Sequence, residues 1–323
     1  MPLLTTVAGG GVKGLGWSAQ IASATTAVFG GGYVNTAVNT MDYLTIETGG
    51  NAVDFGDLTA PRTAFDACSS DTRGLWFSGY YYVSPPTTNI IDYVTFATAG
   101  NASDFGDMVR ARYGLSACSS QTRGVVGGGG DTTVGNALNE MDYVTIATTG
   151  NASDFGNLTV GRRYLAGGCS SPTRGLFVGG YDGSARVNII DYITIASTGN
   201  AADFGDLTVA RSSSASGGAS SDVRGIFSSG YVSTFLDTID YVTIATTGNA
   251  TDFGNLTTAR DGGGATSNNT IAILPGGDGS EPGRLLSIEQ ITIATAGNST
   301  YFSDLSEART SIGCCSSNHG GVQ

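Results

Sequence analysis

Residues 239–260, IDYVTIATTGNATDFGNLTTAR, decide the fold. The stretch begins with β-branched and aromatic residues, which favour a strand, and continues into a Thr-Gly-Asn segment that is typical of a tight turn. A shorter strand-like run follows around Phe253, and the stretch ends at Arg260. It lacks the 3.6-residue hydrophobic period that an amphipathic helix needs. The stretch therefore predicts two successive strands joined by a turn.

The same stretch recurs along the chain at intervals of 49 or 50 residues. Its acidic residue falls at Asp42, Asp92, Asp142, Asp191 and Asp240, and a degraded sixth copy has Glu289. Each stretch is preceded by a run that ends in glycines and, in the copies after the first, by an earlier run of small residues such as Ala, Cys and Ser. Four strand-like runs in each of six copies predict an all-β, six-bladed β-propeller with almost no helix.

The C-terminal end indicates how the ring closes. Residues 308–317 repeat the first-strand pattern of residues 111–120, and no further blade follows them. We expect a C-terminal strand within 310–317 to complete the first blade, so that no sheet edge is left exposed. Residues 17–23 are an alternative for that place, although they match weakly and lack the arginine. The predicted organisation is an N-terminal arm over 1–22 and a propeller over 23–323.

The repeat also resembles a known group of proteins. The unit at 239–260, with SSPTRGLFVGG at 170–180, resembles the kelch-like repeats encoded by marine bacteriophages, over about residues 23–323. The resemblance implies kelch-like four-stranded blades. It also implies a non-enzymatic protein of the virion, made in the host cytoplasm and attached to a tail, baseplate, fibre or capsid. Its partners would be other virion proteins and a glycan or protein of the host surface.

The composition excludes several classes of protein. The chain has 15 Lys and Arg residues against 27 Asp and Glu residues, a net charge of −12, and Lys13 is its only lysine. Nucleic-acid binders need clustered basic residues, so we expect no nucleic-acid partner. No apolar run reaches the roughly 18 residues of a membrane span, and we expect no membrane insertion. The N-terminal residues show no signal-peptide pattern.

An arginine closes each repeat, and it has two interpretations. The six residues are Arg62, Arg112, Arg162, Arg211, Arg260 and Arg309. By symmetry they form a ring near one mouth of the channel, which could bind an anion or a sugar acid. Each copy also carries acids that could pair with the arginine, such as Asp57 or Asp92. We favour this pairing, because a chain with few charges that repeats one arginine six times uses it structurally.

The residue types that usually act in catalysis are either rare in this chain or recur once in each repeat. His319 is the only histidine, and Asp-Phe-Gly recurs with the repeat, as at Asp54, which indicates a structural role. The cysteines are Cys68, Cys118, Cys169, Cys314 and Cys315. Four of the five share one position of the first strand, which lines the axis and requires small side chains. We expect buried free thiols, no metal site, no cofactor and no enzymatic activity.

Variation among the copies is concentrated in one connection, between the second and third strands of each unit. Its length and chemistry change from copy to copy, and it is rich in tyrosine. The tyrosines concerned are Tyr33, Tyr80, Tyr81, Tyr82, Tyr181 and Tyr231. A rigid frame that presents variable loops on one face is typical of a recognition module, so we expect these residues to bind a partner. The alternative is that the loops vary because nothing selects their sequence.

The predicted arm contains Trp17, Lys13 and a glycine-rich segment at 9–11. A tryptophan can anchor a contact, so the arm is a candidate attachment to a partner protein. The alternative is that it packs back over the first blade. An alternative function for the whole chain is a carbohydrate-binding or glycan-cleaving propeller, and cleavage would need two positioned carboxylates. A protein-binding kelch adaptor is a further alternative, but no adaptor domain accompanies the repeats.

Overall fold

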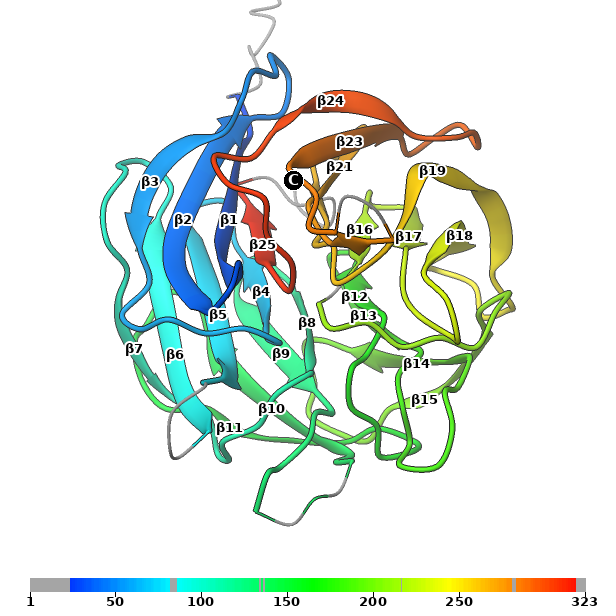
Figure 1. Cartoon of the computed structure of the whole chain (residues 1–323). Coiled ribbons are helices and arrows are strands. Elements are labelled where there is room, and N and C mark those ends of the chain that lie inside the picture. Colours follow the sequence, from blue (N-terminus) through cyan, green and yellow to red (C-terminus); the bar gives the residue numbers. More distant parts are fainter. Residues whose placement is uncertain are drawn as a thin grey trace, which may run out of the picture.

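The computed structural model is an all-β ring of six small antiparallel sheets arranged as the blades of a propeller (Figure 1). It describes residues 24–81, 86–133, 135, 137–215, 217–280 and 283–317. The described residues contain no helix, and therefore none that could span a membrane. The six-bladed propeller predicted from the repeat is confirmed.

Each blade runs from an inner strand beside the axis to an outer strand at the rim. Blade 1 contains β25 (Gly313–Ser316), β1 (Thr26–Tyr33), β2 (Ala37–Thr45) and β3 (Val53–Asp57). Blade 2 contains β4 (Asp66–Ser69), β5 (Arg73–Tyr80), β6 (Thr87–Thr95) and β7 (Ser103–Asp107). Blade 3 contains β8 (Ser116–Ser119), β9 (Arg123–Gly127), β10 (Glu140–Thr145) and β11 (Ser153–Asn157).

The other three blades follow the same order. Blade 4 contains β12 (Gly167–Ser170), β13 (Arg174–Val178), β14 (Ile189–Thr194) and β15 (Ala202–Asp206). Blade 5 contains β16 (Gly218–Ser220), β17 (Arg224–Ser228), β18 (Leu236–Thr243) and β19 (Thr251–Asp261). Blade 6 contains β20 (Thr266–Ser267), β21 (Ile271–Pro275), β23 (Ser287–Thr292) and β24 (Thr300–Asp304). Between β21 and β23, β22 (Asp278–Gly279) pairs with the end of β19 in blade 5.

The ring is closed by the C-terminal strand. β1 pairs with β2 on one edge and with β25 on the other, so the last strand of the chain completes the first blade (Figure 1). The expectation of C-terminal closure is confirmed, and the edge for which residues 17–23 would compete is occupied by β25. Those residues, like the rest of the predicted arm, lie outside the described part of the chain.

The Asp-Phe-Gly repeat holds neighbouring blades together. In blade 1, Phe55 is buried on the outer strand and packs edge to face against Tyr43, with ring centroids 5.6 Å apart. Gly56 has a φ of +143°, and a Cβ there would lie 2.5 Å from the carbonyl of Gly100 in blade 2. Glycine is therefore required by the close approach of the next blade. This is the structural role that the sequence predicts.

Candidate binding face at one mouth of the propeller

Each closing arginine is buried and pairs with a carboxylate on the third strand of the blade that it leads into. The N–O distances of five pairs are 2.5 to 3.0 Å: Arg62–Asp92, Arg112–Asp142, Arg162–Asp191, Arg211–Asp240 and Arg309–Asp42. The sixth pair is Arg260 with Glu289. Burial lowers the pKa of Arg162, and the charge of Asp191 opposes that shift.

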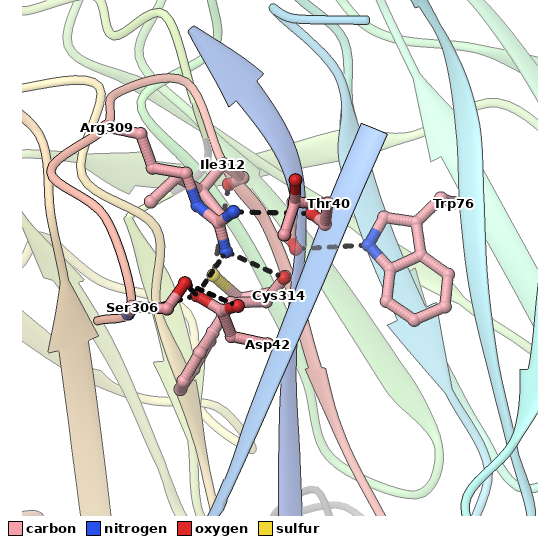
Figure 2. Close-up of polar contacts among 9 residues, drawn as sticks. Thr40, Asp42, Trp76, Ser306, Arg309, Ile312 and Cys314 are labelled. Atoms are coloured by element: carbon pink, nitrogen blue, oxygen red, sulfur yellow. Dashed lines mark hydrogen bonds and ion pairs between the residues drawn. The ribbon is translucent and has the colours of Figure 1, made fainter. Parts of the chain in front are cut away.

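The same carboxylate also reaches the preceding blade. Asp92 accepts hydrogen bonds from the Thr59 hydroxyl at 2.7 Å and from the Thr59 backbone N–H at 3.0 Å. Figure 2 shows the equivalent set at the ring closure, where Arg309 and Ser306 both converge on Asp42. We call each set of an arginine, its carboxylate and the residue of the preceding blade that donates to that carboxylate a carboxylate clamp. The clamp ties one blade to the next.

The clamps decide between the two interpretations of the arginines. All six arginine side chains are at most 1% exposed, and each faces its carboxylate. These side chains therefore present no charge to solvent. Pairing is the arrangement that the structure supports, and these six residues do not form an accessible ring for an anion.

The axis is lined by the inner strands and is nearly closed. The cavity there has a volume of about 50 Å³, which leaves room for a few water molecules. Six serine hydroxyls encircle it, and each donates a hydrogen bond of 2.6 to 2.8 Å to the backbone carbonyl of the preceding serine in the ring. The serines are Ser69, Ser119, Ser170, Ser220, Ser267 and Ser316.

The cysteines of the inner strands are buried free thiols, as the sequence predicts. A Cβ on Gly124 would lie 2.8 Å from the Cys68 sulfur, so the thiol of one blade packs against a glycine of the next. Burial raises the pKa of Cys68 to about 12, which leaves the thiol protonated and unreactive. No group of three or more potential metal ligands occurs among the described residues.

The variable loops and the arginine turns meet at one mouth of the channel. The residue that follows each closing arginine belongs to the next blade and pairs with the end of that blade's second strand. Thr63 pairs with Tyr80 in this way, and Arg163 pairs with Tyr181. Ser212 pairs with Tyr231 in the same way. The described loop tyrosines at this position therefore lie around this mouth, namely Tyr33, Tyr80, Tyr181 and Tyr231.

Tyrosines and arginines are interleaved around this mouth. Tyr33, Tyr80, Tyr81, Tyr181 and Tyr231 are all half-buried. Arg284 of blade 6 lies over the ring of Tyr33 in blade 1, with its guanidinium carbon 4.8 Å from the ring centroid. Arg186 of blade 4 lies over Tyr231 of blade 5 at 4.7 Å. Such cation–π contacts hold the rings across blade boundaries.

Three residues that join the predicted tyrosines were missed by the sequence analysis. Tyr113 packs edge to face against Tyr80, with centroids 5.8 Å apart, and against Tyr164 at 5.4 Å. Arg163 donates a hydrogen bond of 3.2 Å to the Tyr113 hydroxyl. The signal was available, because the residues after the closing arginine differ from copy to copy as much as the loops do.

Two carboxylates lie at the same mouth in blades 5 and 6. Asp261 and Asp278 are directly paired across β19 and β22. Burial raises the pKa of both carboxyls. Asp261 accepts a hydrogen bond of 3.3 Å from the Ser214 backbone N–H, and Arg284 lies 3.9 Å from Asp278. Sequence reasoning did not single out these acids.

Four of the predicted residues cannot be placed. Tyr82, Trp17, Lys13 and His319 lie outside the described residues. The predicted attachment through the N-terminal arm therefore stays a prediction.

No protein-family model matches the chain, and no curated protein matches it. The architecture alone defines its class, a six-bladed β-propeller. This fold is consistent with a role in protein interaction or ligand binding, and it hosts many unrelated functions.

Proposed function

We propose that the protein is a non-enzymatic binding protein of a bacteriophage virion, which presents the tyrosine-rich mouth of the propeller to the host surface. The observation that supports the binding role is that the propeller's structural residues repeat, whereas the loops at its mouth vary. Clamps, glycines and inner strands repeat from blade to blade, whereas the connections at the mouth change in length and sequence, although four of them begin with a tyrosine. Half-buried tyrosines on a rigid frame supply contact area at a low conformational cost.

The virion assignment rests on the resemblance of the repeat to kelch-like repeats of marine bacteriophages. In this proposal the partners are other virion proteins on one side and a host glycan or protein on the other. The test is antibody-labelled electron microscopy of purified particles, with peptide mass spectrometry of the same preparation. Label on a tail, baseplate, fibre or capsid supports the proposal, whereas a protein found only in the infected-cell lysate contradicts it.

The host-binding role has its own test. Purified protein should compete with particles for adsorption to host cells, and a variant with Tyr80 and Tyr181 both changed to Ser should compete much less. A variant changed at Tyr301, which is 59% exposed on outer strand β24, is the control because it alters an exposed tyrosine outside the loop ends. Equal competition by all three proteins would show that the mouth does not carry binding.

The paired acids Asp261 and Asp278 favour glycan cleavage as a second candidate function, because glycosidases use two carboxylates of which one has a raised pKa. We propose an inert protein, because Ser214 and Arg284 already engage these acids structurally. Release of reducing ends from host polysaccharide, abolished by Asp261→Asn, would establish the enzyme instead.

A further inference from the structure

Tyr164 has a backbone conformation that a tyrosine rarely adopts. Its φ is +53°, in the left-handed region. The equivalent positions in four other blades have the same conformation with small residues, namely Ala64, Gly114, Gly262 and Ser311. A bulky side chain in this region is a genuine outlier, and such outliers point to function when the surroundings maintain them. The other blades therefore show which side chains this backbone conformation normally carries.

The neighbouring blade leaves room for the Tyr164 ring. A Cβ on Gly114 would lie 3.0 Å from that ring and 2.8 Å from the Tyr164 backbone nitrogen. The ring packs edge to face against Tyr113, and Tyr113 does the same against Tyr80. Arg163 lies over Tyr164 at 6.0 Å and over Tyr181 at 5.5 Å. We call Tyr80, Tyr113, Tyr164 and Tyr181, with Arg163 among them, the tyrosine arc.

The arc holds a positive charge without an acidic partner. Among the described residues, no carboxylate lies within ion-pair distance of Arg163, and its Nε is buried without a hydrogen-bond partner. The whole chain has a net charge of −12, and the clamp arginines are all paired. The Arg163 guanidinium donates a hydrogen bond to the Tyr113 hydroxyl but has no carboxylate partner, so it suits a ligand that brings a carboxylate.

We propose that the tyrosine arc binds an acidic glycan. Pyranose rings of the glycan pack their C–H faces on the tyrosines, and a sugar carboxylate pairs with Arg163. Tyr164 sets the specificity, because it supplies an aromatic surface where the other described blades have a small residue. The inference rests on the proposed function and gives its host ligand a chemical class.

The test is calorimetric titration of the full chain with tetragalacturonate, tetramannuronate and sialyllactose. Each acid is compared with its methyl ester. At least one acid should bind, and its ester should bind at least tenfold more weakly. Arg163→Gln should remove that preference. Binding of none of the acids, or equal binding of acid and ester, would overturn the proposal.

The decisive variant is Tyr164→Gly. Glycine adopts a positive φ without strain, and this relief offsets part of the packing lost with the ring, so this protein should melt close to the parent while binding glycan at least tenfold more weakly. A tyrosine with a merely structural role would change the melting temperature without weakening glycan binding. Tyr301→Ala is the matched control and should bind as the parent does. If Tyr164→Gly binds normally, the arc is not the site.

Competition for host adsorption separates this inference from the proposed function. Protein that blocks adsorption but binds no acidic glycan leaves the host-binding role intact and points to a protein receptor. Protein that binds the glycan but neither blocks adsorption nor occurs in particles confirms the site and contradicts the virion role.

Discussion

The carboxylate clamp between blades 2 and 3 lacks a hydroxyl that the other five have. Val109 stands where the other clamps have Thr59, Thr159, Thr208, Thr257 or Ser306. Its backbone N–H still donates to Asp142, at 3.3 Å. Burial raises the pKa of Asp142, an effect that the charge of Arg112 only partly offsets. We predict that Val109→Thr stabilises the protein.

The magnitude follows from the geometry. Threonine has the shape of valine, and Val109 is 61% exposed, so the substitution loses little apolar burial. The new hydroxyl donates to a charged acceptor, and such a bond contributes about 1 to 2 kcal/mol at a partly buried site. For a chain of this size, that corresponds to an increase of about 2 °C in melting temperature. Thr159→Val, at an intact clamp, should lose a similar amount.

The assay is urea unfolding of the parent and both variants between pH 4 and pH 8. The raised pKa means that folded Asp142 holds its proton more tightly than unfolded Asp142. Its contribution to stability is therefore lost as pH rises through the folded pKa. The hydroxyl introduced by Val109→Thr stabilises the charged form, so the gain should be full at neutral pH and shrink in acid. A neutral or destabilising Val109→Thr at pH 7, alongside a destabilising Thr159→Val, would refute the reasoning.

Other predictions concern ring closure and buried groups. Trp76→Phe should lower the free energy of unfolding by about 2 kcal/mol in urea titrations, because it removes the 3.0 Å hydrogen bond from the indole to the Gly313 carbonyl (Figure 2) and leaves a void. Deleting residues 313–323 should leave β1 with an open edge, and sedimentation should then show aggregates. Burial raises the pKa of Asp261, so its contribution to stability falls as pH rises through the folded value, and Asp261→Asn should flatten the pH profile of the urea midpoint. Cys68, with a pKa of about 12, should resist Ellman reagent at pH 8 until the protein unfolds, and rapid labelling of native protein would contradict this.

The fold could be predicted because each copy carries its own inter-blade contacts. Gly56 must face the Gly100 carbonyl, and the same pair of glycines recurs at the same interval along the chain. The partner of the closing arginine was harder to predict, since Asp57 and Asp92 were both candidates. The structure selects Asp92, which is fully buried on β6, whereas Asp57 lies half-exposed on an outer strand.

The binding face could be predicted only in part. Tyr80 and Tyr181 directly follow the glycines that end a second strand, so their shared position was visible in the sequence. The importance of Tyr164 depends on its φ, which no residue pattern reports. The pairing of Asp261 with Asp278 is equivalent to that of Thr63 with Tyr80, but acids occupy these two positions in blade 6 alone, so the repeat did not single them out.

Because adjoining blades meet through residues that nearly every copy shares, the blades are interchangeable parts. In all six, an asparagine of one blade accepts a hydrogen bond from the outer strand of its neighbour, as Asn101 does from the backbone N–H of Asp57 at 3.1 Å. Genetic exchange between two copies would therefore bring a new loop to the mouth while the asparagine contact between blades is re-formed by an equivalent residue. Recombination within such a gene can change the loops at the mouth of the propeller while the protein keeps its fold.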